Sequence, residues 1–307
     1  GVHDKARQGA LRFSLEADGP YLTSNNKESI PPLVDLPKLL SATEDYLNNN
    51  ETAEDLKILL EPGASLGGAR PKASVREKDG HLAIAKFPKK DDEFNVVAWE
   101  AVALALAGKA GIHTTSWRLE KIMDRSILIL RRFDRYKGKR IPFLSAMSIL
   151  GAKDHDSHSY LEIAYAIAQH GAKPNSDLEE LWRRIVFTIL ISNTDDHLRN
   201  HGFLYERHKG WCLSPAYDLN PTPIEIKARV LSTSIDFDNP AASIELALSV
   251  IDDFRIKKTR ALEIIQEITL AVSGWRAIAT QLGLSKKEMS RMASAFEHED
   301  LRKIQRG

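Results

Sequence analysis

The stretch from Phe187 to Leu204, which reads FTILISNTDDHLRNHGFL, concentrates side chains that could take part in chemistry. Apolar residues open it and close it. The polar residues between these two apolar runs are Asn193, Asp195, Asp196, His197, Arg199 and Asn200. Carboxylates, amides and bases are costly to bury unless they are paired or bind a ligand. We therefore interpret this stretch as a candidate functional site.

The spacing of three oxygen-bearing residues indicates which chemistry this would be. Asp195 and Asn200 are five positions apart, and a second isolated acid, Asp218, follows after a predicted hairpin. This is the layout of a kinase catalytic loop and its metal-binding Asp. Asp195 would then accept a hydrogen bond from the incoming hydroxyl, while Asn200 and Asp218 would hold Mg²⁺, which prefers oxygen ligands. The plain alternative is a loop rich in turn-forming residues.

A second group of candidates lies earlier, in a loop that ends at Lys72. This loop contains Gly67 and Gly68, followed by Ala69, Arg70 and Lys72. Glycines let backbone amides approach an anion closely, and the two cations could neutralise phosphate. On its own, the loop is explained equally well as a flexible surface turn.

The next segment predicts a lysine at the end of a buried strand. Asp79 and Gly80 form a tight turn between two strand-like runs, and the second run ends at Lys86 and Phe87. A buried ammonium needs counter-charge, which a nucleotide phosphate and Glu100, on the following apolar helix, would provide. Alternatively, Lys86 extends its amine to water from an edge strand.

The remaining pattern predicts strands in the first half and helices in the second. Short strands are expected within 1–24, and hairpins at 75–87, 117–130 and 202–213. The expected helices are 33–47, 52–60, 94–107, 159–169, 178–190 and one capped by Ser285. We expect an α+β, bilobal protein-kinase-like fold, with a mixed β/α N-lobe at 1–133 and a mainly helical C-lobe at 134–307. Backbone groups from Arg131 to Phe133 would form the hinge and face an adenine ring.

Composition narrows the class of protein. The 307 residues are 43% hydrophobic and 28% charged, which is ordinary for a globular chain, and the net charge of +1 gives no global field for nucleic acid or membrane. Cys212 is the single cysteine, so no internal disulfide can form. The most apolar segments are too short to span a bilayer. We expect a cytoplasmic protein.

The ten histidines raise the question of a zinc site. His197 and His201 are four positions apart, but Leu198 stands where a zinc protease carries its catalytic glutamate. The segment from His155 to His158 fits a polar loop at the start of a helix better than a metal site. For Asp196 and Arg199, structural ion pairs are favoured over a role near the transferred phosphate.

Together these motifs resemble the HipA family of serine/threonine protein kinases, toxins of bacterial type II toxin-antitoxin systems. The similarity spans nearly the whole chain and is carried by the combination of its parts. These are Ser65 to Lys72, Ala85 to Pro88, Arg132 to Arg135, Asn193 to Asn200 and Ala216 to Asp218.

The resemblance implies a role for each matching residue. Asp195 would be the catalytic base, Asn200 and Asp218 the Mg²⁺ ligands and Lys86 the ATP contact, with the hinge after the second hairpin. Ser65 would be the serine of the glycine-rich loop whose autophosphorylation expels the loop and inactivates such kinases. A phosphate added to a loop built to hold ATP phosphates would compete with them electrostatically.

The resemblance also implies partners. Family members phosphorylate aminoacyl-tRNA synthetases and are restrained by a small DNA-binding, HipB-like antitoxin, so DNA would be contacted only through the antitoxin. Full HipA proteins carry a small N-terminal subdomain before the region that matches Gly1, and we expect a kinase core without it. Two other functions stay open: a small-molecule or lipid kinase on the same fold, and a non-catalytic nucleotide-binding regulator.

Overall fold

The computed structural model describes residues 4–22, 30–31, 33–48, 50–52, 64–65, 70–89 and 91–306. The chain divides into two compact units. The N-terminal unit comprises Gly1–Ala101 and Thr115–Pro142, and the C-terminal unit comprises Val102–Thr114 and Phe143–Gly307. The division falls inside one helix, α3 (Val96–Lys109), which the sequence places at 94–107.

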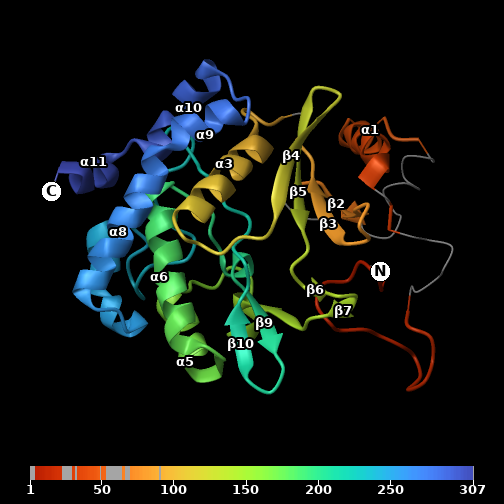
Figure 1. Ribbon diagram of the computed structural model, residues 1–307, viewed down its shortest axis with the longest axis horizontal. Helices are drawn as coiled ribbons and strands as arrows, with labels where there is room; N and C mark the ends of the chain where they lie inside the picture. Colours follow the sequence, from red (N-terminus) through yellow and green to blue (C-terminus); the bar gives the residue numbers. More distant parts are fainter. Residues whose placement is uncertain are drawn as a thin grey trace. The chain divides into compact units, whose positions relative to one another are not determined.

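A five-stranded antiparallel sheet forms the centre of the N-terminal unit, in the order β1-β2-β3-β5-β4 (Figure 1). Its strands are β1 (Ala64–Ser65), β2 (Lys72–Arg76), β3 (Leu82–Lys86), β4 (Trp117–Ile122) and β5 (Arg125–Arg131). The two predicted hairpins are confirmed. Gly80, in the turn between β2 and β3, has a φ of +83°, a left-handed conformation that glycine adopts without strain.

One face of this sheet packs on helix α1 (Leu36–Leu47), as Figure 1 shows. Alternate strand residues point toward the helix, because side chains along a strand alternate between its faces. The residues in this core include Leu36, Leu39, Leu40, Ala73, Val75, Ala83, Ala85, Ile127 and Ile129. Lys72 and Lys86 therefore belong to the opposite face. The predicted helix at 33–47 is confirmed, and the one at 52–60 lies outside the described residues from 53 onward.

Strands predicted near the N-terminus are wrong for the part described. Residues 4–22 form turns and bends with one isolated bridge, between Ser14 and Tyr21. Arginine side chains take the place of a partner strand. The Arg132 guanidinium donates to the backbone oxygens of Ala6 (2.6 Å) and Arg7 (3.1 Å). These carbonyls therefore need no hydrogen bond from a neighbouring strand.

Asp134 is the carboxylate at the centre of this arrangement. It accepts hydrogen bonds from Arg132, from Arg135 and from the backbone N–H of Gly9, which lies 2.7 Å away. Burial alone would raise the pKa of Asp134, but the bonds and charges of the two arginines hold it below its ordinary value. A buried charge persists only when it is paired in this way. Two short strands, β6 (Arg135–Tyr136) and β7 (Lys139–Arg140), follow.

The C-terminal unit is mainly helical, as expected. Its long central helix, α6 (Pro174–Leu190), is buried almost all round from Leu181 to Leu190 and packs on α5 (Tyr160–His170) and α8 (Lys258–Ser273). The other helices are α4 (Ala146–Ile149), α7 (Ile244–Ser249), α9 (Trp275–Gln281), α10 (Lys286–Phe296) and α11 (Glu299–Arg306). The predicted capping box at Ser285 and Glu288 is confirmed. None of the described helices has the length and apolar character needed to cross a bilayer.

A small sheet of order β10-β9-β8 completes this unit, with β8 (Phe143–Ser145), β9 (Gly202–Glu206) and β10 (Gly210–Leu213). The hairpin of β9 and β10 is the one predicted from the sequence. Gly202 lies where a Cβ atom would come within 2.5 Å of the Phe143 ring, so a larger residue there would require the Phe143 side chain to shift. The candidate loop thus runs between the end of α6 and the start of β9, anchored at both ends by buried structure.

We predict that Asp134→Asn lowers the free energy of unfolding at pH 7 by about 3 to 5 kcal/mol, because it leaves the buried Arg132 without its counter-charge. Since the folded pKa of Asp134 is lowered, its stabilisation is present above about pH 4, the ordinary pKa of an aspartate, and is lost as the pH falls through the folded pKa. Urea unfolding at pH 7 and pH 3 measures both effects. Asp124→Asn, at a side chain that is 95% exposed, is the control. Equal losses in the two variants at pH 7 would contradict this account.

Candidate active site

In the N-terminal unit, Lys86 and Glu100 form a close ion pair. The Lys86 Nζ lies 2.6 Å from Oε1 and 2.8 Å from Oε2 of Glu100. The side chains are 12% and 2% exposed, so both charges are largely withdrawn from water. Lys86 is the last residue of β3, and its side chain lies on the sheet face opposite α1. There it meets Glu100, which lies in the second turn of α3. The structure therefore makes the pair that the sequence predicts.

The glycine-rich loop is described only at its two ends. At one end, Ser65 in β1 pairs with Lys72 in β2, and Lys72 pairs in turn with Lys86 in β3. Gly67, Gly68 and Ala69 lie outside the described residues. At the other end, the Arg70 guanidinium binds both carboxylate oxygens of Asp92, at 2.5 and 2.7 Å. Arg70 thus anchors the end of the loop, and Lys72 lies exposed beside Lys86 in the register of the sheet.

Backbone groups of the predicted hinge are partly used within the unit. The Arg131 N–H donates to the Ser116 carbonyl at 2.9 Å, and the Arg131 carbonyl accepts from the Thr115 hydroxyl at 2.7 Å. The Arg132 N–H donates to the carbonyl of Leu82 at 2.9 Å. These bonds fix the chain up to the half-buried Phe133, so an adenine contact by Arg131 would use groups other than its N–H.

In the C-terminal unit, the candidate loop rises from the core to the surface at Asp195. Helix α6 is followed by Ser192, whose φ is +52°, and Ser192, Asn193 and Thr194 are fully buried. The Asp195 side chain is 63% exposed. Its Oδ1 lies 3.5 Å from the Nζ of Lys227, a cation that the sequence analysis did not single out. A buried stem that carries an exposed carboxylate is the geometry a base needs to meet a substrate hydroxyl.

Asp196, the next residue, turns inward and holds the loop. Its carboxylate is buried, accepts a hydrogen bond from the Tyr160 hydroxyl at 2.5 Å and lies 3.2 Å from the Nε2 of His201. Burial alone would raise the pKa of Asp196, but the charge and hydrogen bond of His201 and the bond from Tyr160 lower it. The Thr233 hydroxyl donates to the Asp196 backbone carbonyl at 2.7 Å. Asp196 thus has a structural role through Tyr160 and the nearby His201, and Arg199 forms a structural ion pair with Asp154, as expected.

Asn200 and Asp218 lie on neighbouring segments of this unit. The Tyr217 hydroxyl donates to the Arg199 carbonyl at 2.7 Å, and the Asn220 N–H donates to Oδ1 of Asn193 at 3.2 Å. These two bonds place 217–220 beside the candidate loop. Asp218 itself has a φ of +60°, a conformation uncommon for a residue with a Cβ atom.

The donor set of these two residues fits a magnesium ion. The Nδ2 of Asn200 donates to the backbone carbonyl of Asp195 at 3.3 Å, which directs the amide oxygen away from that bond. An amide oxygen and the Asp218 carboxylate are hard ligands, and Mg²⁺ commonly takes one or two carboxylates together with substrate phosphates and water. Among the described residues, no group of three or more His, Cys, Asp or Glu side chains could hold a metal ion by itself.

The sequence analysis missed the residues that hold the loop from other elements. Tyr160, Lys227 and Thr233 reach it from three other places in the chain, and His201 contacts Asp196 from within the stretch. The only sequence signal was His201, which was weighed as a metal ligand because it lies four positions after His197. The structure gives it a different task, since its ring faces Asp196. The other histidine cluster is explained by His158, whose Nδ1 lies 3.0 Å from Glu162 at the start of α5.

Comparison with known families gives a match over most of the chain. The model of the HipA-like C-terminal domain family matches residues 64–295. A Haemophilus influenzae protein named "Putative kinase" is 27% identical over 185 residues, which are 53% of this chain and 54% of that protein. "Putative kinase Y4mE" of Sinorhizobium fredii is 25% identical over 184 residues, which are 52% of this chain and 42% of that protein. The aligned part thus spans about half the length of these curated relatives.

Two solved structures resemble the fold. HipA of Shewanella oneidensis MR-1, solved in a toxin-antitoxin complex with HipB and operator DNA, matches with a TM-score of 0.69 at 16% identity, over 94% of this chain and 74% of that one. The proinflammatory kinase CtkA of Helicobacter pylori matches with a TM-score of 0.58 at 18% identity, over 79% of this chain and 90% of that one. At these identities the likeness concerns the fold alone, and it confirms the expected α+β, kinase-like fold.

We predict that Tyr160→Phe costs about 1.5 to 3 kcal/mol of unfolding free energy, because it removes a hydrogen bond to a buried carboxylate. Tyr165→Phe is a matched control on the same helix. Its hydroxyl donates to Asp253 at 3.0 Å, but the residue is 48% exposed, so we expect a change within about 0.5 kcal/mol. Urea unfolding followed by circular dichroism measures both. Similar losses for the two variants would show that Asp196 does not depend on Tyr160.

Proposed function

This chain belongs to the HipA-like C-terminal domain family, and on that premise we propose that it is an ATP-dependent serine/threonine protein kinase, the toxin of a bacterial toxin-antitoxin system. The observation that carries the proposal is the Lys86–Glu100 ion pair. A protein kinase uses a strand lysine held by a helix glutamate to orient the nucleotide phosphates. The loop with Asp195 and Asn200, followed by Asp218, supplies the other half of the machinery.

In the proposed reaction, the substrate hydroxyl oxygen bonds to the γ-phosphorus of ATP, and the bond from that phosphorus to the β,γ-bridging oxygen breaks to release ADP. Asp195 accepts a hydrogen bond from the attacking hydroxyl and takes its proton. Asn200 and Asp218 would hold Mg²⁺, which when bound neutralises charge on the phosphates. Lys227, 3.5 Å from Asp195, adds a positive charge near the attacking group.

On the nucleotide side, Lys86 binds phosphate oxygens while Glu100 keeps its ammonium in place. Lys72 and the backbone of Gly67, Gly68 and Ala69 would cover the phosphates. Arg131 and Phe133 would border the adenine. The anchoring of Arg70 by Asp92 supports this division of roles, because it fixes one end of the loop and leaves Lys72 as the exposed cation next to Lys86.

We also propose that Ser65 is an autophosphorylation site. Its backbone pairs with Lys72 at the edge of the sheet, directly before the glycine-rich loop. A phosphate at this position carries about −2 charge and would compete with ATP phosphates for Lys72 and the loop amides. Phosphorylation of Ser65 would therefore inactivate the kinase.

The partners follow from the family and from the structural neighbour. The Shewanella oneidensis protein was solved with HipB and operator DNA. We propose a HipB-like antitoxin for this chain, with DNA contacted only through it. The proposed substrate is an aminoacyl-tRNA synthetase, whose phosphorylation in the cytoplasm would stop translation and growth.

We predict that Asp195→Ala abolishes both phosphate transfer from labelled ATP and growth inhibition, with a loss of at least about a thousandfold in rate because the substrate hydroxyl loses its base and its positioning. Asp238→Ala, at an exposed acid of the same unit, should keep both activities. Growth inhibition that persists in Asp195→Ala would contradict the proposal and favour a non-catalytic nucleotide-binding regulator.

The molecule that accepts the phosphate distinguishes a protein kinase from the alternative, a small-molecule or lipid kinase. Purified protein, incubated with γ-labelled ATP and cell lysate, should transfer label to a discrete protein band on serine or threonine. Asp195→Ala serves as the blank. Label confined to metabolites or lipids would overturn the proposed substrate class while keeping the proposed kinase chemistry.

A further inference from the structure

A basic pocket lies in the N-terminal unit, away from the pair of Lys86 and Glu100. Its volume is about 780 Å³. It is bordered by the N-terminal segment, the tip of the β2–β3 hairpin and the β6–β7 hairpin. Seven of its lining residues are lysine or arginine, against two aspartates, Asp4 and Asp79. These cations include Arg12, Arg76, Arg135, Lys137, Lys139 and Arg140.

The two aspartates do not neutralise this charge. Asp4 is shared by Arg12, at 2.6 Å, and Arg140, at 3.4 Å. Asp79 pairs with His81 at the hairpin tip, at 2.9 Å. Within the described part of the chain, Arg76, Lys137 and Lys139 have no carboxylate partner. The pocket therefore carries positive charge that the protein itself leaves uncompensated.

Two further arginines of the pocket, Arg135 and Arg140, have carboxylate neighbours, Asp134 at 2.7 Å and Asp4 at 3.4 Å, and are withdrawn from water. The side chains of Arg135 and Arg140 are 11% and 17% exposed. Burial, together with the charge of nearby Arg132, lowers the pKa of Arg135 to about 10. Burial also lowers the pKa of Arg140, and the charges of Arg12 and Arg132 add to this effect. Repulsion between cations that water screens poorly is relieved when an anion binds between them.

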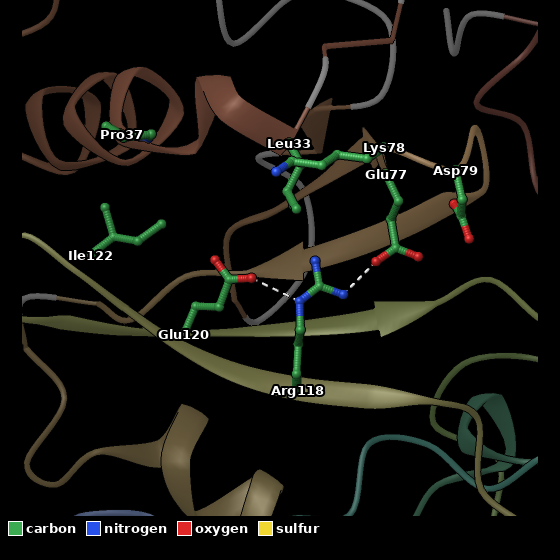
Figure 2. Close-up of a pocket in the computed structure, with 8 residues that line it drawn as sticks. All are labelled: Leu33, Pro37, Glu77, Lys78, Asp79, Arg118, Glu120 and Ile122. Carbon is green, nitrogen blue, oxygen red and sulfur yellow. Dashed lines mark hydrogen bonds and ion pairs between the residues drawn. The ribbon is translucent and has the colours of Figure 1, made fainter.

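The neighbouring pocket offers a contrast within the same unit (Figure 2). There Arg118 lies between Glu77 and Glu120, and its guanidinium is paired with both carboxylates. The three acids of that pocket outnumber its two cations, so it has no excess of positive charge to offer an anion. Of these two pockets, the one beside the N-terminal segment has the excess of positive charge.

The basic pocket is separate from the proposed ATP phosphates. It contains Arg76 and Leu82, which pair at the tip end of the β2–β3 hairpin, whereas Lys72 and Lys86 pair at its other end. The two ends are four residues apart along each strand, which is about 13 Å. One diphosphate cannot occupy both places.

We propose that this pocket binds the diphosphate group of a small molecule. Guanidinium groups match phosphate oxygens in geometry and charge. The volume lies in the range of small-molecule sites, about 300 to 1,000 Å³. No phenylalanine, tyrosine or tryptophan lines the pocket among the described residues, which disfavours a single-stranded nucleic acid, because such ligands stack their bases on aromatic rings.

The test is titration of the full chain with inorganic pyrophosphate in the absence of Mg²⁺, followed by calorimetry. Lys137→Glu combined with Lys139→Glu reverses two exposed charges of the pocket and should weaken binding at least tenfold. The matched control is Lys78→Glu combined with Lys121→Glu. It makes the same change in net charge at exposed lysines of the same unit that do not line the pocket, and it should leave the affinity within twofold.

A third variant, Lys86→Met, separates this pocket from the proposed ATP site. Pyrophosphate binding that survives Lys86→Met but is lost in the Lys137/Lys139 variant supports the proposal. The opposite pattern, or no binding to the wild-type chain, overturns it, as does preference for a single-stranded oligonucleotide over pyrophosphate. An arm with ADP on the Lys86→Met background shows whether the diphosphate is free or carried by a nucleotide.

Discussion

The structure of the N-terminal unit depends on the pairing of a lysine ammonium that is largely buried. Lys86 ends a strand whose alternate residues, Ala83 and Ala85, are committed to the core against α1, so its own side chain must lie on the other face. There it meets Glu100, which is even more deeply buried. Breaking such a pair costs about 3 to 5 kcal/mol, so strand and helix are held in one register by charge as well as by apolar packing. A phosphate that approaches this ammonium meets a donor that is already oriented.

The C-terminal unit likewise contains a buried charged group, the carboxylate of Asp196. Asp195 and Asp196 are adjacent, yet one is exposed and the other is buried between Tyr160 and His201. The buried acid fixes the backbone of its neighbour, and Thr233 fixes the same turn through a backbone carbonyl. Because the loop is tied at Asp196, the exposed carboxylate of Asp195 is carried on a firm support. Preorganisation of this kind lets a base act without an entropic cost at each turnover.

Arginine side chains hold the N-terminal segment against the rest of the N-terminal unit. Arg132 and Arg135 donate to backbone oxygens of the N-terminal segment, and Asp134 accepts from the backbone N–H of Gly9. These bonds explain why that segment needs no sheet partner. The hinge was predicted at Arg131 to Phe133, and within it the side chain of Arg132 binds backbone oxygens of the N-terminal segment. Of the arginines that bind this segment, Arg135 also lines the basic pocket.

Local patterns in the sequence were sufficient for most of the architecture. The hairpin turn at Gly80, the capping box at Ser285 and the apolar periodicity of α6 each depend on neighbours within a few residues, and all were predicted. The pairing of Lys86 with Glu100 was also expected, since only one acid on the next helix could reach. The contacts of Asp196 with Tyr160, of Asp195 with Lys227 and of Arg132 with Ala6 join residues that are 32 to 126 positions apart, and no local pattern encodes them.

The central proposal is that Lys86, Asn200 and Asp218 all serve the transfer of phosphate from ATP. An experimental structure with Mg²⁺ and a non-hydrolysable ATP analogue tests it most directly. We expect the β- or γ-phosphate within hydrogen-bonding distance of the Lys86 ammonium and a metal ion bound by Asn200 and Asp218. A nucleotide bound elsewhere, with Lys86 contacting only Glu100 and no metal at Asp218, would contradict the account.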